Sequence, residues 1–402
     1  MRNFILYSVC LLFFLSCENF SDDDFESHNI NLHIVLPQEI IDTTNIAGQI
    51  SVSLTNTRKG YTIAAKTDST GHVRLNEVES GIYLINISEH FEFEKYSLIL
   101  NGSSELLING STNDSITLSH SVVQKDGGNF IIREYYYSAC LTPNKKQYIN
   151  DQYVEIYNNS PDTLYADSLL LVEHESYATS PNFFAPIQAD SIVTKAMWAL
   201  PQGKRHPIAP GKGFIIAQDA MNHKSDPNGN RLSPVDMGDA EFEFWSDKVA
   251  STGDVDFPAE NMVNKLWVYK GTEYVFHTRG GSAIAIVKIP GDVDEYVKNN
   301  LAPKGTASGD TKYYCKIPNK WVIDAVEATW NSGMQQGYKR FDNSIDAGIT
   351  FVKAGARSGL CVRRKIDYKI DYKIGSRTVY QDTNNSSVDF LTDQIPQPRN
   401  YE

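Results

Sequence analysis

Residues 152–169 read Gln152-Tyr153-Val154-Glu155-Ile156-Tyr157-Asn158-Asn159-Ser160-Pro161-Asp162-Thr163-Leu164-Tyr165-Ala166-Asp167-Ser168-Leu169. The stretch consists of a strand that carries one acidic residue, a polar turn, and a second strand that ends in a Leu-rich edge. Asn, Ser, Pro and Asp are the residue types that form such turns, because they hydrogen-bond their own backbone or fix φ. The stretch therefore predicts β structure in the second half of the chain.

Other segments extend this pattern in chain order. They are an apolar run at 130–137, a Gly turn with a strand at 210–217, and a closing pair at 358–364 and 381–390. With residues 152–169 they resemble the lamin-tail domain, an immunoglobulin-like β-sandwich. The resemblance implies that residues 130–402 form such a domain. Because this kind of sandwich needs only about 100 residues, we expect insertions at about 174–207, 220–262 and 290–340, and long loops on a rigid sandwich are where binding residues usually lie.

Residues 28–121 alternate apolar and polar side chains in short runs, which is typical of half-buried strands packed as a sandwich. Two Gly turns, at Gly71 and Gly81, bracket a short strand and precede an aromatic strand. This strip resembles the transthyretin-like or carboxypeptidase-regulatory-like β-sandwich, a module that usually serves as a spacer or docking element. The polar, Gly-rich residues 122–129 are the expected linker. The predicted fold is thus mainly β, with two β-sandwich domains.

The N-terminus carries an export signal. An apolar run at 4–15 follows Arg2, is too short to span a bilayer, and ends in Ser16-Cys17. It resembles a bacterial lipoprotein signal, which implies that residues 1–16 are cleaved and that Cys17 is lipidated and holds the protein on the membrane. The acidic tether at 17–27 resembles the tag that directs lipoproteins of Bacteroidota to the cell surface. A plain solvated tether is the alternative, since a run of like charges resists compaction.

Composition excludes one class of partner. Removal of residues 1–16 takes away one basic and no acidic side chain, so the formal charge changes from −12 to −13. Nucleic acid is therefore not an expected partner, because its affinity comes largely from Lys and Arg that neutralise phosphates. Cys140, Cys315 and Cys361 form no CxxC motif. They are expected to be small buried hydrophobic residues rather than metal ligands.

The sequence contains none of the common catalytic or cofactor-binding motifs, so no catalytic residue, metal site or cofactor is predicted. The chain has no HExxH, GxSxG, P-loop or Gly-rich dinucleotide motif. Asp226, Asn228 and Asn230 have the spacing of calcium ligands, but Met237 stands where a bidentate Glu is required, which favours a simple turn. Glu155 lacks a recognisable catalytic partner, and we expect it on the outer face of its strand.

Two surface features remain. Tyr177, Phe183, Phe184 and Trp198 place aromatic rings in and after a Pro-bounded loop, and exposed rings are common anchors in binding interfaces. The alternative is that these rings fold back and cap the sandwich. A tandem Lys-Ile-Asp-Tyr unit at 365–374 alternates in period two, and the duplication of four residues should lengthen a hairpin without moving any side chain to the other face.

The whole architecture is identified as that of a Bacteroidota surface lipoprotein family of unknown function, whose members accompany TonB-dependent outer-membrane transporters. The resemblance implies a non-enzymatic binding or accessory protein at the outer membrane, exposed on the cell surface, with such a transporter or a neighbouring lipoprotein as its partner. A lipoprotein enzyme with a site built from the insertions is one alternative. A structural envelope protein is the other.

Overall fold

The structure is a computed structural model, and it describes residues 26–37, 46–92, 96–124, 129–201, 206–245, 255–268, 274–329, 338–371 and 376–401. Strands dominate these residues, and the two α-helices among them are short. The predicted mainly β, sandwich-rich fold is confirmed. Cys17, the signal segment and most of the acidic tether lie outside the described residues.

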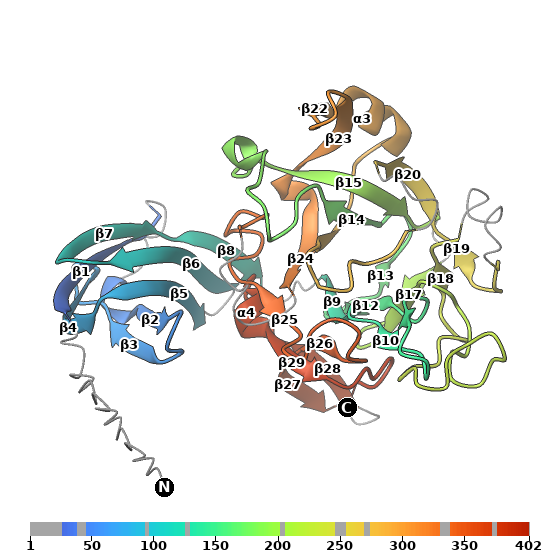
Figure 1. The fold of residues 1–402 in the computed structure, drawn as a ribbon, viewed down its shortest axis with the longest axis horizontal. Coiled ribbons are helices and arrows are strands. Elements are labelled where there is room, and N and C mark those ends of the chain that lie inside the picture. The colour runs from blue at the N-terminus through green and yellow to red at the C-terminus, as the bar shows by residue number, and fades with distance from the viewer. Residues whose placement is uncertain are drawn as a thin grey trace, which may run out of the picture.

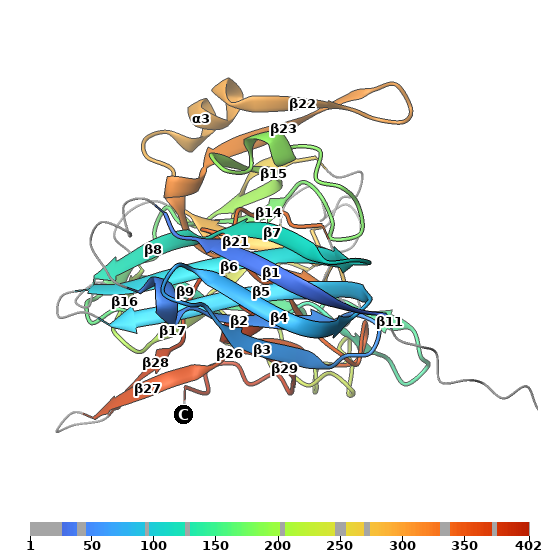
Figure 2. The same ribbon diagram turned by 90° about the vertical axis from the view of Figure 1, so that its left-hand side faces the viewer.

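The N-terminal unit holds two sheets, seen at the left of Figure 1 and facing the viewer in Figure 2. A three-stranded sheet has the order β4-β1-β7, and a five-stranded sheet has the order β3-β2-β5-β6-β8. Their elements are β1 (Ser27–Val35), η1 (Ala47–Gln49), β2 (Ser51–Asn56), β3 (Thr62–Lys66), β4 (His72–Glu79), β5 (Gly81–Glu92), β6 (Tyr96–Ile108), β7 (Thr112–Thr117) and β8 (Ser119–Gln124).

The period-two pattern of the N-terminal strands places one side of each strand in a shared core. Leu32 from the smaller sheet and Val52 and Ile85 from the larger one are all buried there. The alternation holds on β5, where Ile85 faces the core and Ile82 is 40% exposed on the outer face. Gly71 adopts φ +79° in the predicted turn before β4, a conformation that glycine takes without a steric penalty.

The second unit consists mainly of two larger sheets. The first has the order β19-β18-β17-β12-β9-β26-β29; the second has the order β22-β23-β15-β14-β21-β24-β25, with β20 also paired to β15. The strands of the first are β9 (Phe130–Tyr136), β12 (Tyr153–Asn158), β17 (Gly213–Ala217), β18 (Phe242–Glu243), β19 (Glu260–Asn261), β26 (Cys361–Arg364) and β29 (Phe390–Gln394). Those of the second are β14 (Leu170–His174), β15 (Ser191–Ala199), β20 (Val263–Trp267), β21 (Ala283–Val287), β22 (Leu301–Gly305), β23 (Thr311–Pro318), β24 (Val322–Thr329) and β25 (Thr350–Phe351).

Small elements complete the second unit. They are β10 (Cys140–Leu141), β11 (Gln147–Tyr148), β13 (Leu164–Tyr165), β16 (Pro207–Ile208), β27 (Ile366–Asp371), β28 (Ser376–Tyr380), η2 (Ala185–Ile187), η3 (Asn319–Trp321), α3 (Val293–Asn299) and α4 (Ser386–Asp389). Residues 366–371 of the tandem repeat form β27, which pairs with β28 in an antiparallel hairpin that projects at the bottom of Figure 2. Asp292 caps the N-terminus of α3 by accepting a hydrogen bond from the amide of Glu295.

The core of the second unit lies between its two large sheets. Val154 and Ile156 of β12 face Leu171 of β14 and Trp198 of β15 across this core. The expected insertion at 174–207 is therefore only partly a loop, because Ser191–Ala199 forms an inner strand of the larger sheet. The segment therefore contributes a strand to the sandwich, and it also contains the Pro-bounded loop at 177–186, which we call the aromatic loop.

Glu155 does point away from this core, as predicted, but it is fully buried. The C-terminal segment covers the outer face of β12 and β9, where Arg133 lies 2.5 Å from a Glu155 oxygen and the Arg399 amide donates to the other at 2.9 Å. The Tyr401 ring packs on Tyr157 of the same face, with ring centroids 5.0 Å apart. A charged residue on an outer strand face is thus buried because a distant segment covers it.

Two smaller expectations concern the cysteines and the turn at Asp226. Cys140, Cys315 and Cys361 are free and buried, as predicted. Asp226 forms a turn in which its Oδ1 accepts from the Asn228 amide at 2.8 Å, as the simple-turn interpretation requires. Among the described residues, no helix combines the length and apolar character that a membrane span needs.

Polar contacts join the two units, with α4 beside the N-terminal sheets in Figure 1. Asn86 of β5 donates to the Ser387 hydroxyl at 2.8 Å, and Asn385 donates back to Asn86 at 3.1 Å. Asn101 of β6 donates to the carbonyl of Thr383. The five-stranded sheet therefore presents its outer face to the second unit through amide and hydroxyl groups rather than through an apolar core.

Candidate functional site

The four aromatic residues predicted as anchors divide into three environments. Phe183 is 55% exposed at the tip of the loop. Phe184, next to it, is half-buried and packs on Tyr314 with ring centroids 6.0 Å apart. Tyr177 is half-buried beside a cavity. The loop therefore combines one exposed ring with two that support its base.

Trp198 does not belong to this surface. It is 2% exposed and packs between the sheets against Phe244, Trp267 and Tyr274, with ring centroids 5.4 to 5.7 Å apart. Alternation on β15 directs Trp198 inward with Ala196, so the expectation of a ring available to a partner is corrected at this position.

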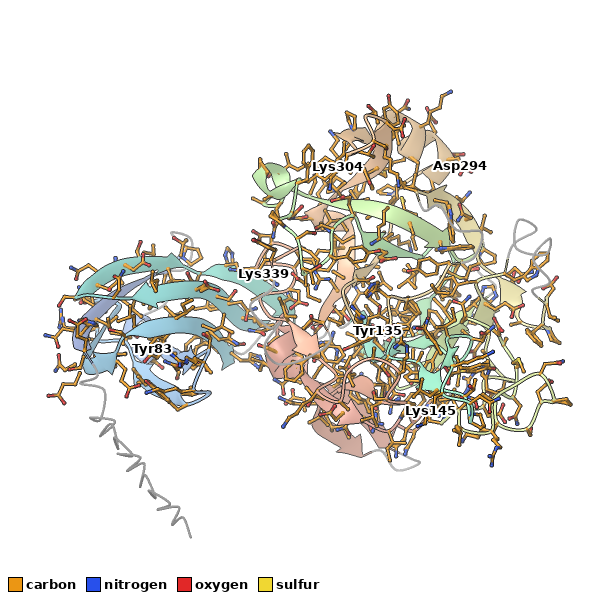
Figure 3. The ribbon with its side chains drawn as sticks, viewed as in Figure 1. Tyr83, Tyr135, Lys145, Asp294, Lys304 and Lys339 are labelled. Atoms are coloured by element: carbon orange, nitrogen blue, oxygen red, sulfur yellow. The ribbon has the colours of Figure 1, made fainter. Side chains whose placement is uncertain are left out.

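A cavity of about 300 Å³ opens beside the aromatic loop. Three lysines give it its character, and we call it the lysine pocket. Its lining is Glu175, Ser176, Tyr177, Ser180, Lys195, Val268, Lys304, Lys312 and Tyr314. These residues come from the ends of β14 and β20, from β15, and from the β22–β23 hairpin, so the pocket lies at one end of the eight-stranded sheet; Figure 3 labels Lys304 there.

The β22–β23 hairpin places two of the lysines opposite each other. Lys304 and Lys312 are direct cross-strand partners in the antiparallel register. Like charges directly opposite on neighbouring strands repel and destabilise the pair. Lys304 is compensated by an ion pair with Glu175, whereas Lys312 donates only to the carbonyl of Val268, at 3.2 Å. Among the described residues, Lys312 has no carboxylate partner, so it leaves the mouth of the pocket positive.

Glu175 is buried at 8% exposure. One of its carboxylate oxygens, Oε1, holds Lys304, while the other, Oε2, is shielded from solvent and has no hydrogen-bond donor in the described part of the chain. A buried carboxylate oxygen without a donor carries an uncompensated desolvation cost. The site therefore contains an acceptor that a bound group could satisfy.

Lys195 forms the inner wall of the pocket. Its Nζ lies 2.9 Å from Oε1 of Glu173 and 3.6 Å from the centroid of the Tyr177 ring. The ring face attracts the cation through its quadrupole, and the carboxylate neutralises it. Glu173 also accepts a hydrogen bond from the Ser282 hydroxyl. Lys195 is therefore fixed in position, and its charge is compensated by the Glu173 carboxylate and the Tyr177 ring.

Two histidines near the pocket have lowered pKa values, which favours their neutral forms. Burial, with the nearby charges of Arg340 and Lys195, lowers the pKa of His174 well below its usual value. Its Nδ1 accepts a hydrogen bond from the Ser176 amide at 3.1 Å, which places any ring proton on Nε2. Burial and Lys195 likewise lower the pKa of His277. The positive charge of the site therefore comes from its lysines.

The lysines and Glu175 were not predicted as site residues. Lys195 had a signal in the sequence, because it interrupts an otherwise apolar strand at 191–199. Lys304 and Lys312 also had one, because each lies four residues from Ser308 in the polar turn that joins the two strands. No signal in the sequence indicated that these lysines lie beside Tyr177, because that arrangement depends on how three distant segments pack. No group of His, Cys, Asp and Glu suited to hold a metal occurs among the described residues.

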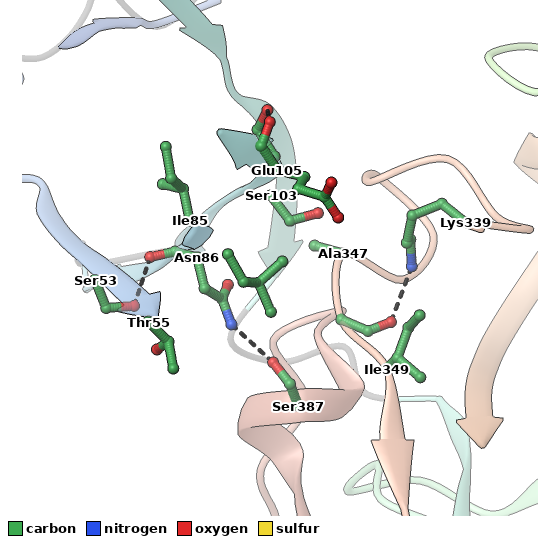
Figure 4. Close-up of a pocket in the computed structure, with 13 residues that line it drawn as sticks. Ser53, Thr55, Ile85, Asn86, Ser103, Glu105, Lys339, Ala347, Ile349 and Ser387 are labelled. Atoms are coloured by element: carbon green, nitrogen blue, oxygen red, sulfur yellow. Dashed lines mark hydrogen bonds between the residues drawn. The ribbon is translucent and has the colours of Figure 1, made fainter. Parts of the chain in front are cut away.

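A second cavity of about 300 Å³ lies at the junction of the two units (Figure 4). Ser53, Asn86 and Glu105 line it from the N-terminal side, and Lys339 and Ser387 line it from the other. Its polar groups are largely engaged: Lys339 donates to the carbonyl of Gly348 at 2.9 Å, and Asn86 bonds Ser387. We therefore interpret this cavity as a packing gap between the two units, and the lysine pocket is the better candidate site.

Comparisons with known proteins show similarity to one family, and that family has no assigned activity. Residues 209–397 match the model of a family described as proteins of unknown function, DUF4876. The chain is similar to a crystal structure of a DUF4876 family protein from Bacteroides thetaiotaomicron VPI-5482, with 26% sequence identity and a TM-score of 0.60 over 93% of this chain and 97% of that one. No curated protein matches the chain. The expected resemblance to a family of unknown function is confirmed.

Proposed function

We propose that the protein is a non-enzymatic lipoprotein of the outer membrane that binds a ligand in the lysine pocket, as an accessory component of a TonB-dependent uptake system. The signal sequence with Cys17 and the acidic segment after it support the membrane address. The resemblance to surface lipoproteins supports the link to a transporter. The transthyretin-like and lamin-tail-like types of the two units belong to the same proposal.

One observation carries the binding function. The aromatic loop predicted as a binding element lies at the mouth of a cavity, and the Nζ atom of Lys304 lies 5.2 Å from the centroid of the exposed Phe183 ring. Ligand sites are typically concave, with aromatic walls and a few convergent polar groups. Charge, rings and an unsatisfied acceptor converge here from sequence-distant segments.

The lining of the pocket favours binding over catalysis. Glu175 is the one carboxylate among the described lining residues, and Lys304 occupies one of its oxygens. Hydrolysis of a glycosidic bond generally uses two carboxylates that flank the bond. Glu173 does not line the pocket and is held by Lys195 and Ser282. These contacts support a site that holds a ligand without transforming it.

The binding function is tested with the full-length lipoprotein in detergent micelles. Saturation-transfer NMR would compare neutral oligosaccharides, acidic oligosaccharides, peptides and nucleotides. At least one class should bind, and Lys312→Ala or Phe183→Ala should weaken that binding. Two matched controls should leave binding unchanged: Lys316→Ala on the same strand, and Tyr313→Ala, which removes a ring that is 54% exposed.

Three outcomes would contradict the proposal. If no ligand class binds, or if Lys312→Ala and Phe183→Ala leave binding unchanged, the pocket is not the binding site. Product signals that grow during the experiment would favour the enzyme alternative. Cross-linking on intact cells tests the accessory role, and it should join the protein to an outer-membrane transporter identified by mass spectrometry. Recovery of the protein alone would favour a structural envelope role.

A further inference from the structure

We propose that the ligand of the lysine pocket is an acidic sugar, that is, a hydroxyl-bearing ring with one carboxylate or sulfate group. The inference rests on the proposed function, because it names the ligand class of the same site. Three features of the pocket each select one part of such a molecule. They are the lysine pair on the hairpin, the donor-free oxygen of Glu175, and the aromatic walls.

The lysine pair selects the negative group. Lys304 and Lys312 face each other across the β22–β23 register, and of the two only Lys304 has a carboxylate partner within the described part of the chain. An anion beside Lys312 would relieve the repulsion between the two cations and neutralise the positive charge of the Lys312 ammonium group. A neutral ligand would leave this repulsion in place. The hairpin therefore favours a ligand with one acidic substituent.

Glu175 selects the hydroxyl groups. An ionised carboxylate accepts hydrogen bonds and donates none, and its Oε2 has no donor among the residues that the structure describes, so it can accept one from a ligand. The last torsion of a Glu side chain is broad and soft, so a small rotation can turn an oxygen toward the cavity while Lys304 stays paired. A simple anion such as sulfate would meet Glu175 with repulsion. A hydroxyl on the ligand ring offers the missing donor.

The aromatic walls select a ring of modest size. Tyr177 and Tyr314 line the cavity, and Phe183 lies outside it near Lys304. The apolar face of a sugar ring can pack on such side chains while its edges form hydrogen bonds. A volume of about 300 Å³ is at the lower end for ligand pockets. One sugar unit would fill it, and the next unit of a chain would lie over Phe183.

The test uses the full-length lipoprotein in detergent micelles and four probes in ligand-observed NMR titrations. Glucuronic acid and glucose 6-sulfate carry both the ring hydroxyls and a negative group. Glucose lacks the charge, and cyclohexanecarboxylate lacks the hydroxyls. At least one of the two acidic sugars should bind roughly tenfold or more tightly than either control probe, the ratio expected for one charge-assisted hydrogen bond. The tighter of the two identifies the acidic group.

Two variants separate the contributions. Lys312→Ala should reduce binding of the acidic sugar toward that of glucose, while Lys316→Ala should change nothing. Glu175→Gln should weaken the acidic sugar yet leave cyclohexanecarboxylate unchanged or tighter, since it removes a negative charge. If neither acidic sugar binds more tightly than glucose, the acidic part of the inference is overturned. If cyclohexanecarboxylate binds as tightly as the better acidic sugar, the sugar part is overturned. Failure of all four probes would overturn the inference, while the broader ligand panel still decides the binding function.

Discussion

Lys195 is held between a carboxylate and an aromatic face, with its Nζ 2.9 Å from Glu173 and 3.6 Å from the centroid of the Tyr177 ring. Both Lys195 and Glu173 are nearly inaccessible to solvent. The pair thus joins the interior of the second unit to the wall of the lysine pocket. A change at Lys195 should therefore affect stability as well as binding.

We expect Lys195→Ala to destabilise the protein by about 3 to 5 kcal/mol, because it leaves the buried charge of Glu173 without its cation. Urea unfolding followed by tryptophan fluorescence measures the change. Lys316→Ala is the control, and it should alter the unfolding free energy by less than about 0.5 kcal/mol because the side chain is exposed. An equally small effect of Lys195→Ala would show that the pair is not the support that the geometry indicates.

The two neighbouring phenylalanines should respond differently. Phe183→Ala should leave the unfolding free energy within about 0.5 kcal/mol and weaken ligand or partner binding, typically by 2 kcal/mol or more for an anchor residue. Phe184→Ala should cost about 1 to 3 kcal/mol of stability, since a half-buried ring loses part of the cost of a fully buried one. Thermal unfolding and titration of each single variant check this. If Phe183→Ala binds normally, Phe183 is not a binding anchor, and the alternative that the ring caps the sandwich is favoured.

Trp198 should behave as a core residue. Trp198→Ala should cost about 3 to 5 kcal/mol, because it opens a cavity among Phe244, Trp267 and Tyr274. Trp198→Phe should cost clearly less, since it keeps much of the ring and removes an indole N–H that has no acceptor in the described part of the chain. Denaturant titrations of both variants measure the difference. Normal stability of Trp198→Ala with impaired binding would contradict its position in the core.

Glu243 should make stability depend on pH. Burial raises the pKa of Glu243 from 4.5 to about 8, although the amides of Ala220 and Phe257 donate to its carboxylate. The folded state then holds a proton that the unfolded state has already released. The contribution of Glu243 is complete below pH 4.5 and is lost as the pH rises through 8, by roughly a few kcal/mol. Unfolding midpoints should fall over that range, and Glu243→Gln should flatten the slope; equal slopes would contradict the shift.

We expect membrane anchoring to depend on Cys17. Cys17→Ala should move the protein from the membrane fraction to the soluble fraction, because stable attachment needs several acyl chains at about 0.8 kcal/mol per buried CH₂. Replacement of Asp22, Asp23 and Asp24 by Ala should separately abolish protease accessibility on intact cells. Fractionation and surface proteolysis measure the two effects. Membrane retention without Cys17 would remove the lipoprotein interpretation, and continued accessibility would leave the acidic segment as a simple tether.

Local patterns predicted the β class and much of the strand content, because alternation and turn residues act over a few positions. Leu32, Val52 and Ile85 face the core that their spacing indicated, and Gly71 forms the turn that its flexibility permits. The outward direction of Glu155 was also predictable from the period of two. Its burial was not, since the C-terminal segment that covers it, with Arg399, lies far away in the chain.

The sequence by itself determined the mainly β fold and the aromatic loop, and it is the whole basis of the predicted export signal, since each is encoded in consecutive residues. Only the tertiary structure decided that Trp198 lies in the core while Phe183 stays at the surface, because β15 pairs on both sides inside a sheet. The same holds for the lysine pocket. Lys195, Lys304 and Glu175 meet there because β23 pairs with β15 and brings its hairpin beside the end of β14. Such pairing between distant strands follows from long-range packing, which no local pattern contains.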